Sequence, residues 1–189
     1  MNNIAIFASG RGSNARTIIE HFKDHDTIRV ALIVSNKPHA PVLDIAREHQ
    51  IPYLVIDRAF FYQTENILEK FTIYHINFLV LAGFLWLIPE YLVRAFDKRM
   101  INIHPALLPK YGGKGMYGMH VHRAVKAAKE SYSGITIHYV NEHYDEGQAI
   151  FQAQCAIAET DEAEDIAKKV QQLEHQHFAQ VIEELLTKH

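Results

Sequence analysis

Short apolar runs alternate with amphipathic segments along the first half of the chain. The segments between the runs carry apolar residues at helical spacing, as at Ile18, Ile19 and Phe22. The runs are rich in Val, Ile and Leu and end in glycine, proline or polar residues, which is typical of strands. They cover residues 4–8, 28–34, 52–56 and 77–82. This alternation predicts right-handed β-α-β units around a mostly parallel sheet.

The second half of the chain departs from this regular alternation. Residues 100–104 form a short apolar run, and residues 134–140 and 148–157 are two strand-like segments joined by residues 141–147. Because a short connection suits antiparallel strands, we expect these two to extend the sheet as a hairpin. The predicted fold class is α/β: a Rossmann-like, doubly wound, mixed but mostly parallel sheet with helices on both faces.

The last predicted element is a long helix over residues 161–186. Asp161, followed three residues later by Glu164, resembles a capping box with Asp in place of Ser or Thr. Apolar residues line one face of this helix, and Glu174 falls inside the apolar stripe. A carboxylate in such a stripe is unusual unless it has a partner. The alternative is that Glu174 lies at the edge of the stripe and reaches water.

Composition is that of an ordinary globular chain, which we treat as one domain over residues 1–189. Hydrophobic residues make up 48% and charged residues 22%, values that exclude disordered and collagen-like proteins. Cys155 is the only cysteine, so neither an internal disulfide nor a cysteine-based zinc site can form. A net charge of −3 argues against a nucleic-acid partner.

Hydropathy argues against a membrane protein. The longest apolar run, residues 78–88, is shorter than the roughly 18 residues that indicate a membrane span. The N-terminus lacks the basic start and long apolar stretch of a signal peptide. We therefore expect a cytoplasmic protein with small-molecule partners and no membrane partner. The oligomeric state stays open, a homodimer included.

A glycine-rich segment follows the first strand. Residues 10–15 match the pattern G-x-G-x-x-G/A between a predicted strand and a predicted helix. Glycines allow close backbone approach, and a helix N-terminus offers free N–H groups to an anion. Residues 35–37, where the second strand ends, lack the acid that a dinucleotide site requires. The pattern favours a phosphate or another anion, with Ser13 and Asn14 as further ligands. A dinucleotide site and a purely structural turn are the alternatives.

An amide and an imidazole are paired at the end of another strand. Asn102 and His104 are two residues apart, so they project to the same side near the carboxyl end of their strand. Together they can donate hydrogen bonds to an oxyanion, and the imidazole can move protons near neutral pH. Asp145, in a turn before the last strand, would raise the pKa of His104 if it lay close. The alternatives are a pair bridging a strand end to a loop and an ordinary turn aspartate.

The remaining histidines and the cysteine suggest no further chemistry. The chain has 13 histidines, including His120-x-His122 and His175-x-His177, but no H-E-x-x-H motif. We therefore expect no catalytic metal and mostly surface or satisfied histidines. Cys155 lies among apolar residues of a predicted strand, which favours a packed core residue over a nucleophile.

Four segments together resemble the phosphoribosylglycinamide formyltransferases, within the folate-dependent formyltransferase superfamily. They are residues 10–14, 81–84, 102–109 and 144–147. They follow the family's order and span nearly the whole chain, with residues 170–175 as a weaker fifth segment. The resemblance implies the formyltransferase fold. It also implies transfer of the formyl group of 10-formyltetrahydrofolate to the amine of glycinamide ribonucleotide, in purine synthesis and without a metal.

The resemblance also assigns roles to individual residues. It makes Asn102, His104 and Asp145 the catalytic group, with Asp145 keeping His104 protonated. It places the substrate's phosphate on Gly12, Ser13 and Asn14, and its ribose or amide at Glu174. It places the folate on Leu85, Trp86, Leu87, Ile88 and Asn102. We further expect activity to fall below about pH 6–7, as the amine and Asp145 take up protons.

Three features differ from the family pattern. Trp86 stands where a basic residue is common, and the region around Thr64 lacks the family's arginine. Residues 112–118 are longer and richer in glycine than in short members, which suggests a flap over the phosphate end. The alternatives are other formyl-folate enzymes, a nicotinamide dehydrogenase and a non-catalytic nucleotide-binding module. Formyltetrahydrofolate hydrolase carries an extra N-terminal domain, whereas this sequence starts at its first strand.

Overall fold

The computed structural model of the chain describes residues 1–187 and contains one seven-stranded sheet. The strands lie in the order β3-β2-β1-β4-β5-β6-β7. They are β1 (Asn2–Phe7), β2 (Ile28–Ser35), β3 (Tyr53–Val55), β4 (Phe78–Leu81), β5 (Met100–His104), β6 (Tyr132–Tyr139) and β7 (Ala149–Ala156). The helices are α1 (Ser13–His21), α2 (Val42–Glu48), α3 (Arg58–Gln63), α4 (Ile67–Ile73), α5 (Glu90–Ala95), α6 (Met119–Ala127) and α7 (Ala163–Thr187).

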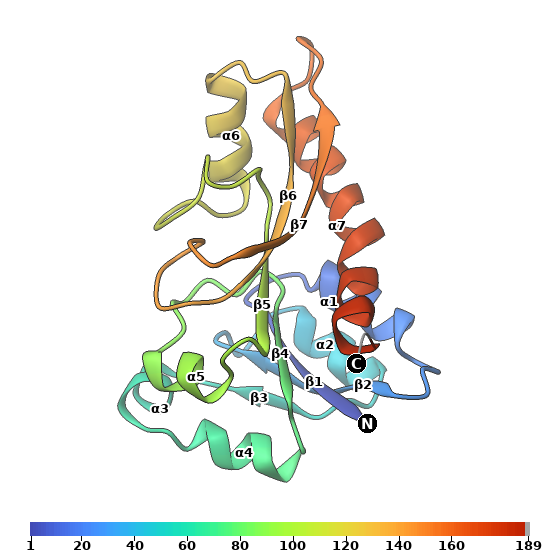
Figure 1. Cartoon of the computed structure of the whole chain (residues 1–189), viewed down its shortest axis with the longest axis vertical. Helices are drawn as coiled ribbons and strands as arrows, with labels where there is room; N and C mark the ends of the chain where they lie inside the picture. Colours follow the sequence, from blue (N-terminus) through green and yellow to red (C-terminus); the bar gives the residue numbers. More distant parts are fainter. Residues whose placement is uncertain (188–189) are drawn as a thin grey trace.

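The predicted α/β class is confirmed. Strands β1 to β5 are parallel, and β6 and β7 extend the sheet as an antiparallel hairpin. Two apolar cores lie on opposite faces of the sheet: one includes residues of α1, α2, α6 and α7, and the other includes residues of α3, α4 and α5. The sheet therefore has helices on both faces (Figure 1). The central strand β4 is buried along its whole length, as its continuous apolar sequence predicts.

Helix α7 covers the half of the sheet that the hairpin extends. It contacts β6 and β7 and lies side by side with α1 and α6 (Figure 1). The predicted cap at Asp161 is wrong by one residue. The N–H of Glu162 is bound by the carboxylate of Asp165, 3.1 Å away, so the reaching-back interaction of a capping box starts at Glu162. Asp161 instead accepts from the Ala158 N–H at 2.8 Å and from Lys169.

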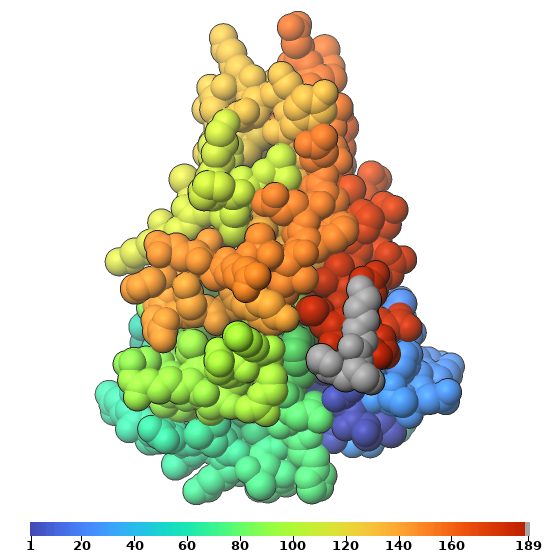
Figure 2. All heavy atoms as spheres, viewed as in Figure 1, coloured from blue at the N-terminus to red at the C-terminus, as the bar shows by residue number. Residues whose placement is uncertain are grey.

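The sheet order reverses between β1 and β4, and this reversal positions the site. In open α/β sheets, ligands bind beyond the carboxyl ends of the strands at such a switch point. The glycine segment follows β1, residues 83–88 follow β4, and His104 ends β5. The turn between β6 and β7, orange in the space-filling view, lies directly above the green segment that contains α5 (Figure 2).

Residues 188–189, the end of the expected domain, lie outside the described part. Within residues 1–187, no helix is both long enough and apolar enough to cross a membrane.

Candidate active site

One cavity of about 900 Å³ lies beyond the carboxyl ends of β1, β4 and β5. Eleven residues assigned to a site from the sequence all line it. They are Gly12, Ser13, Asn14, Leu85, Trp86, Leu87, Ile88, Asn102, His104, Asp145 and Glu174. Since these residues come from five separate segments of the chain, the fold gathers every part of the predicted site around one space.

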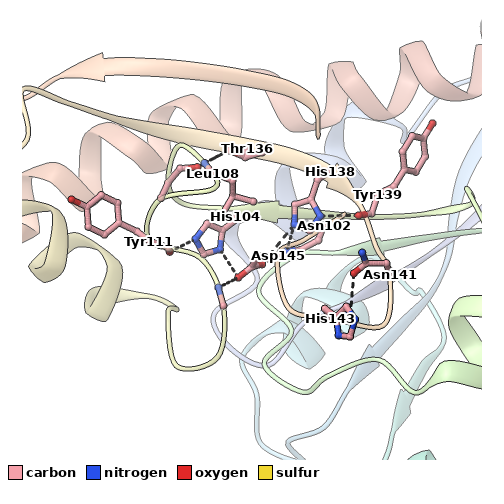
Figure 3. Close-up of polar contacts among 12 residues, drawn as sticks. Asn102, His104, Leu108, Tyr111, Thr136, His138, Tyr139, Asn141, His143 and Asp145 are labelled. Atoms are coloured by element: carbon pink, nitrogen blue, oxygen red, sulfur yellow. Dashed lines mark hydrogen bonds and ion pairs between the residues drawn. The ribbon is translucent and has the colours of Figure 1, made fainter. Parts of the chain in front are cut away.

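Asp145 joins the two polar side chains of β5. Its Oδ1 accepts from the Asn102 Nδ2 at 3.4 Å, and its Oδ2 lies 3.4 Å from the His104 Nδ1 (Figure 3). The carboxylate comes from the turn after β6, where Asp145 has a positive φ of 59°. Asp is among the few residues that adopt this left-handed conformation readily. The predicted approach of Asn102, His104 and Asp145 is thus observed.

The hydrogen-bond partners of His104 define its orientation. Its Nε2 lies 2.7 Å from the Tyr111 carbonyl O, which can only accept, so Nε2 carries the proton. Its Nδ1 faces the Asp145 carboxylate, also an acceptor. Only the protonated imidazole can donate to both neighbours at once. These two contacts therefore favour a second proton on the Nδ1 of His104.

Burial opposes this second proton. The His104 side chain is 4% exposed, and burial lowers its pKa. Asp145 and the Tyr111 carbonyl raise the pKa, but the net direction is below the ordinary value of 6.5. The expectation that Asp145 holds His104 protonated is therefore wrong for the site as it stands. The carboxylate acts in the predicted direction, but the loss of water around the ring outweighs it.

Asp145 itself is held ionised. Burial raises its carboxyl pKa, but His138, His104 and the N–H of Gly113, which donates to Oδ2 at 2.9 Å, together lower it below its usual value. The expectation that Asp145 takes up a proton near pH 6–7 is therefore wrong. Asp145 stays an acceptor and a negative charge across the neutral range.

The glycine segment forms a tight entry to α1. Gly12 caps this helix with a φ of 75°. A Cβ added to Gly12 would lie 2.6 Å from the Cγ2 of Val42, so a side chain is excluded by space as well as by conformation. Ser13 and Asn14 are the first two residues of α1, where backbone N–H groups lack helical partners. The cavity therefore meets a helix N-terminus.

Glu174 points from α7 to the same end of the cavity. Its Oε2 accepts from the Asn14 Nδ2 at 2.9 Å. Glu174 therefore has the partner that a carboxylate within an apolar stripe requires. Burial raises the carboxyl pKa of Glu174, and the Asn14 amide opposes this shift. The Asn14 Oδ1 is buried and has no hydrogen-bond partner among the described residues. Asn14 therefore keeps an acceptor for a ligand.

Residues 84–88, which also line the cavity, are apolar and aromatic. The rings of Phe61 and Tyr62 each lie 6.0 Å from the ring of Trp86. The Arg58 guanidinium lies over the Trp86 ring, 5.0 Å from its centroid. A basic side chain thus stands beside Trp86 although Trp86 replaces the basic residue of the family pattern. The position of Arg58 could not be predicted from the sequence, because its side chain reaches Trp86 from α3.

Comparisons with known proteins bear on this geometry. The formyl transferase family matches residues 2–182 of the chain. The phosphoribosylglycinamide formyltransferase of Bacillus subtilis is 36% identical over 193 residues, covering 98% of this chain and 95% of that protein. The chain belongs to the phosphoribosylglycinamide formyltransferase family.

Two further relatives agree with this membership. A chloroplastic phosphoribosylglycinamide formyltransferase of Arabidopsis thaliana is 42% identical over 185 residues, or 95% of this chain. This chain spans 63% of that plant protein's length. The crystal structure of phosphoribosylglycinamide formyltransferase from Bacillus halodurans superposes with a TM-score of 0.88 at 34% identity, over 99% of this chain and 96% of that one. The predicted formyltransferase fold is confirmed.

Three polar residues of this family member were missed from the sequence. His138, opposite Asn102 in the β5–β6 pairing, has its Nε2 3.1 Å from the Asn102 Nδ2. Thr136, opposite His104, accepts at Oγ1 from the Leu108 N–H at 3.0 Å and steadies the segment after His104 (Figure 3). Gln171 donates to the Ser13 Oγ at 3.2 Å from α7. The polar side chains of Thr136 and His138, at alternate positions of a predicted strand, could have indicated the first two of these residues.

No metal site accompanies these groups in the part of the chain that the structure describes. No group of three or more His, Cys, Asp or Glu side chains in residues 1–187 is arranged to hold a metal ion. The metal-free chemistry expected of the family stays a prediction.

We expect acid to destabilise this formyltransferase family member through His122. This side chain, on α6, lines the cavity at 6% exposure, and its Nδ1 lacks a partner among the described residues. Burial, and then the charge of His104, lower its pKa below 6.5. Below about pH 6.5, the unfolded chain therefore binds more protons than the folded chain does. The free energy of unfolding consequently decreases as the pH falls below that value. Urea unfolding from pH 7.5 to 5.0 should show a shallower fall for His122→Asn than for wild type. Equal slopes would contradict the prediction.

Proposed function

We propose that the chain transfers the formyl group of 10-formyltetrahydrofolate to the amine of glycinamide ribonucleotide. The observation that carries this proposal is the meeting of Asn102, His104 and Asp145 in a cavity that also takes in the N-terminus of α1. One end of the cavity suits a phosphate, and the other offers apolar and aromatic surface to a flat ring system. The names of the relatives agree with phosphoribosylglycinamide as the acceptor of a formyl group.

The reaction requires stabilisation of one developing negative charge. The neutral amine attacks the formyl carbon, and the carbonyl electrons move onto its oxygen. An Asn102 N–H and the Nδ1–H of protonated His104 donate to that oxyanion. The new negative charge raises the pKa of the imidazole, which offsets the burial that lowers it in the structure.

Proton movement completes the transfer. The attacking nitrogen loses its proton to the Asp145 carboxylate or to water. When the oxyanion collapses, the bond from the formyl carbon to the folate nitrogen breaks, and that nitrogen takes up a proton. No covalent link to the protein forms, so the reaction needs no nucleophilic side chain.

The proposed substrate positions follow the lining of the cavity. The phosphate lies on the backbone N–H groups at Gly12, Ser13 and Asn14, and Glu174 receives the ribose hydroxyls or the amide of the same substrate. The pterin lies along Leu85 to Ile88, where Leu85 is 37% exposed and Ile88 is buried. Asn102 then lies between the two substrates. The cytoplasmic location stays a prediction from the sequence. The oligomeric state stays open, a homodimer included.

A direct assay tests the proposal. The protein is mixed with 10-formyltetrahydrofolate and glycinamide ribonucleotide, and the release of tetrahydrofolate is followed by absorbance. The expected result is turnover with the ribonucleotide and a far lower kcat/KM with glycinamide, which lacks the phosphoribosyl group. Equal rates with both amines, or no turnover at all, would contradict the proposal.

We expect Asn14→Ala to impair the ribonucleotide end of the site selectively. The substitution removes the amide that holds Glu174 and the free buried acceptor beside it. The KM for glycinamide ribonucleotide should rise about tenfold, because the Asn14 Oδ1 no longer accepts from a ribose hydroxyl or amide N–H of the substrate and Glu174 loses its partner. The KM for the folate donor should change little. Arg58→Ala, which removes the cation over the Trp86 ring, serves as the comparison variant. Equal rises in both KM values for Asn14→Ala would contradict the placement of the ribonucleotide beside Asn14.

A further inference from the structure

The carbonyl that binds His104 is held in place from outside the active-site cavity. The Tyr111 carbonyl O lies 2.7 Å from the His104 Nε2. The side chain of Tyr111 extends away from His104 (Figure 3), and its hydroxyl donates to the Glu130 Oε1 at 2.8 Å. A continuous path therefore runs from Glu130 through the phenol and backbone of Tyr111 to the imidazole.

Tyr111 adopts a backbone conformation that needs support. Its φ is 58°, in the left-handed region that residues with a side chain rarely enter. Such conformations persist where the surroundings impose them. The phenol bond to Glu130 and the packing of the Tyr111 ring against the core supply that constraint.

Glu130 has no direct access to the proposed reaction. It lies between α6 and β6 and lines a second cavity of about 520 Å³ together with Lys110 and Tyr111. It is not among the residues that line the active-site cavity. Any effect of Glu130 on formyl transfer must therefore pass through Tyr111.

We propose that Glu130 is a positioning residue for His104. By fixing Tyr111, it keeps the carbonyl acceptor on Nε2, selects the tautomer with the proton on Nε2, and leaves Nδ1 directed to Asp145. The inference rests on the proposed role of His104 in formyl transfer, and it adds a residue that no substrate touches. The Lys110 ion pair with the same Glu130 oxygen is exposed on its lysine side and contributes little.

Five variants separate this role from simple stability. Tyr111→Phe and Glu130→Ala each break the phenol–carboxylate bond, so each should lower kcat about three- to tenfold with both KM values nearly unchanged. The double variant should lose no more than either single one, because both remove the same hydrogen bond. Glu130→Gln keeps an acceptor for the phenol and should stay within about twofold of wild type. Lys110→Met, the matched control, should do the same.

The imidazole of His104 reports on the same path without turnover. Long-range ¹H–¹⁵N NMR spectra, with the signals assigned by their loss in His104→Asn, should show the Nε2-protonated tautomer in wild type. In Tyr111→Phe and Glu130→Ala, the Nδ1-protonated tautomer should appear and the titration of His104 should move to lower pH. Unchanged tautomer and titration in both variants, or additive losses of kcat, would overturn the proposal. If wild type transfers no formyl group while the NMR changes occur, the proposed function fails and the positioning role stands.

Discussion

Replacing His104 with alanine should reduce kcat for formyl transfer by about 10²–10⁴-fold, the range expected for loss of an acid–base group that also stabilises an oxyanion. The imidazole can supply a positive donor to the cavity, because its Nε2 is bound to the Tyr111 carbonyl and its Nδ1 faces the Asp145 carboxylate and can take up a second proton. The KM values should change much less, because neither the helix N-terminus nor the aromatic end of the cavity is altered. Steady-state kinetics with both substrates measures the effect.

A second substitution separates chemistry from folding. His104 is almost fully buried, so alanine leaves a cavity that itself destabilises the chain. His104→Asn fills more of that space and retains a hydrogen-bond donor, but it cannot carry a positive charge. Both variants should lose activity to a similar degree, with thermal unfolding midpoints that rank by the cavity left behind. Rates within about threefold of wild type in either folded variant would exclude the proposed role.

Replacing Asp145 with asparagine should lower kcat by about 10²–10³-fold, the effect of removing a proton acceptor and a neighbouring charge. The amide oxygen can still accept from the Gly113 N–H, so the turn keeps its shape. The negative charge that raises the pKa of His104 is lost, and that pKa falls further below 6.5. Because the reaction needs the imidazolium, the loss of activity as the pH rises should occur at a lower pH in the variant than in wild type.

The pH profile of kcat distinguishes this account from a loss of structure. The alkaline limb should lie at lower pH in Asp145→Asn than in wild type, whereas a misfolded fraction would scale the rate equally at every pH. The acid limb should be unchanged, since the pKa of Asp145 lies below its usual value and the carboxyl does not titrate there. A variant whose profile keeps the shape of the wild-type profile would contradict the electrostatic role of Asp145.

The parallel half of the fold could be predicted from the sequence because each element carries its own periodicity. Val, Ile and Leu concentrate in β2 and β4, which neighbours cover on both faces. Three short helices, α3, α5 and α6, were not located. The first two span only six residues each, too few to establish a periodic pattern. Packing against the core, rather than local propensity, stabilises helices of that length.

The site shows the same division between local and distant information. Asn102 and His104 could be paired from their spacing alone, since alternate residues of a strand face one side. His138 could not be placed, because its contact with Asn102 depends on the register of β5 against β6. The pKa of His104 was predicted in the wrong direction because burial is a property of the whole fold. Glu174 could be recognised as unusual, but its partner Asn14 lies 160 positions away.

The most direct test of the central claim is a crystal structure of the chain with glycinamide ribonucleotide and a non-reactive analogue of the formyl donor. We expect the formyl oxygen to lie about 2.7–3.1 Å from both the Asn102 Nδ2 and an imidazole nitrogen of His104, the reach of an oxyanion donor. We also expect the phosphate at the N-terminus of α1. A formyl oxygen directed away from both side chains, with the amine still beside the formyl carbon, would contradict the proposed roles of Asn102 and His104.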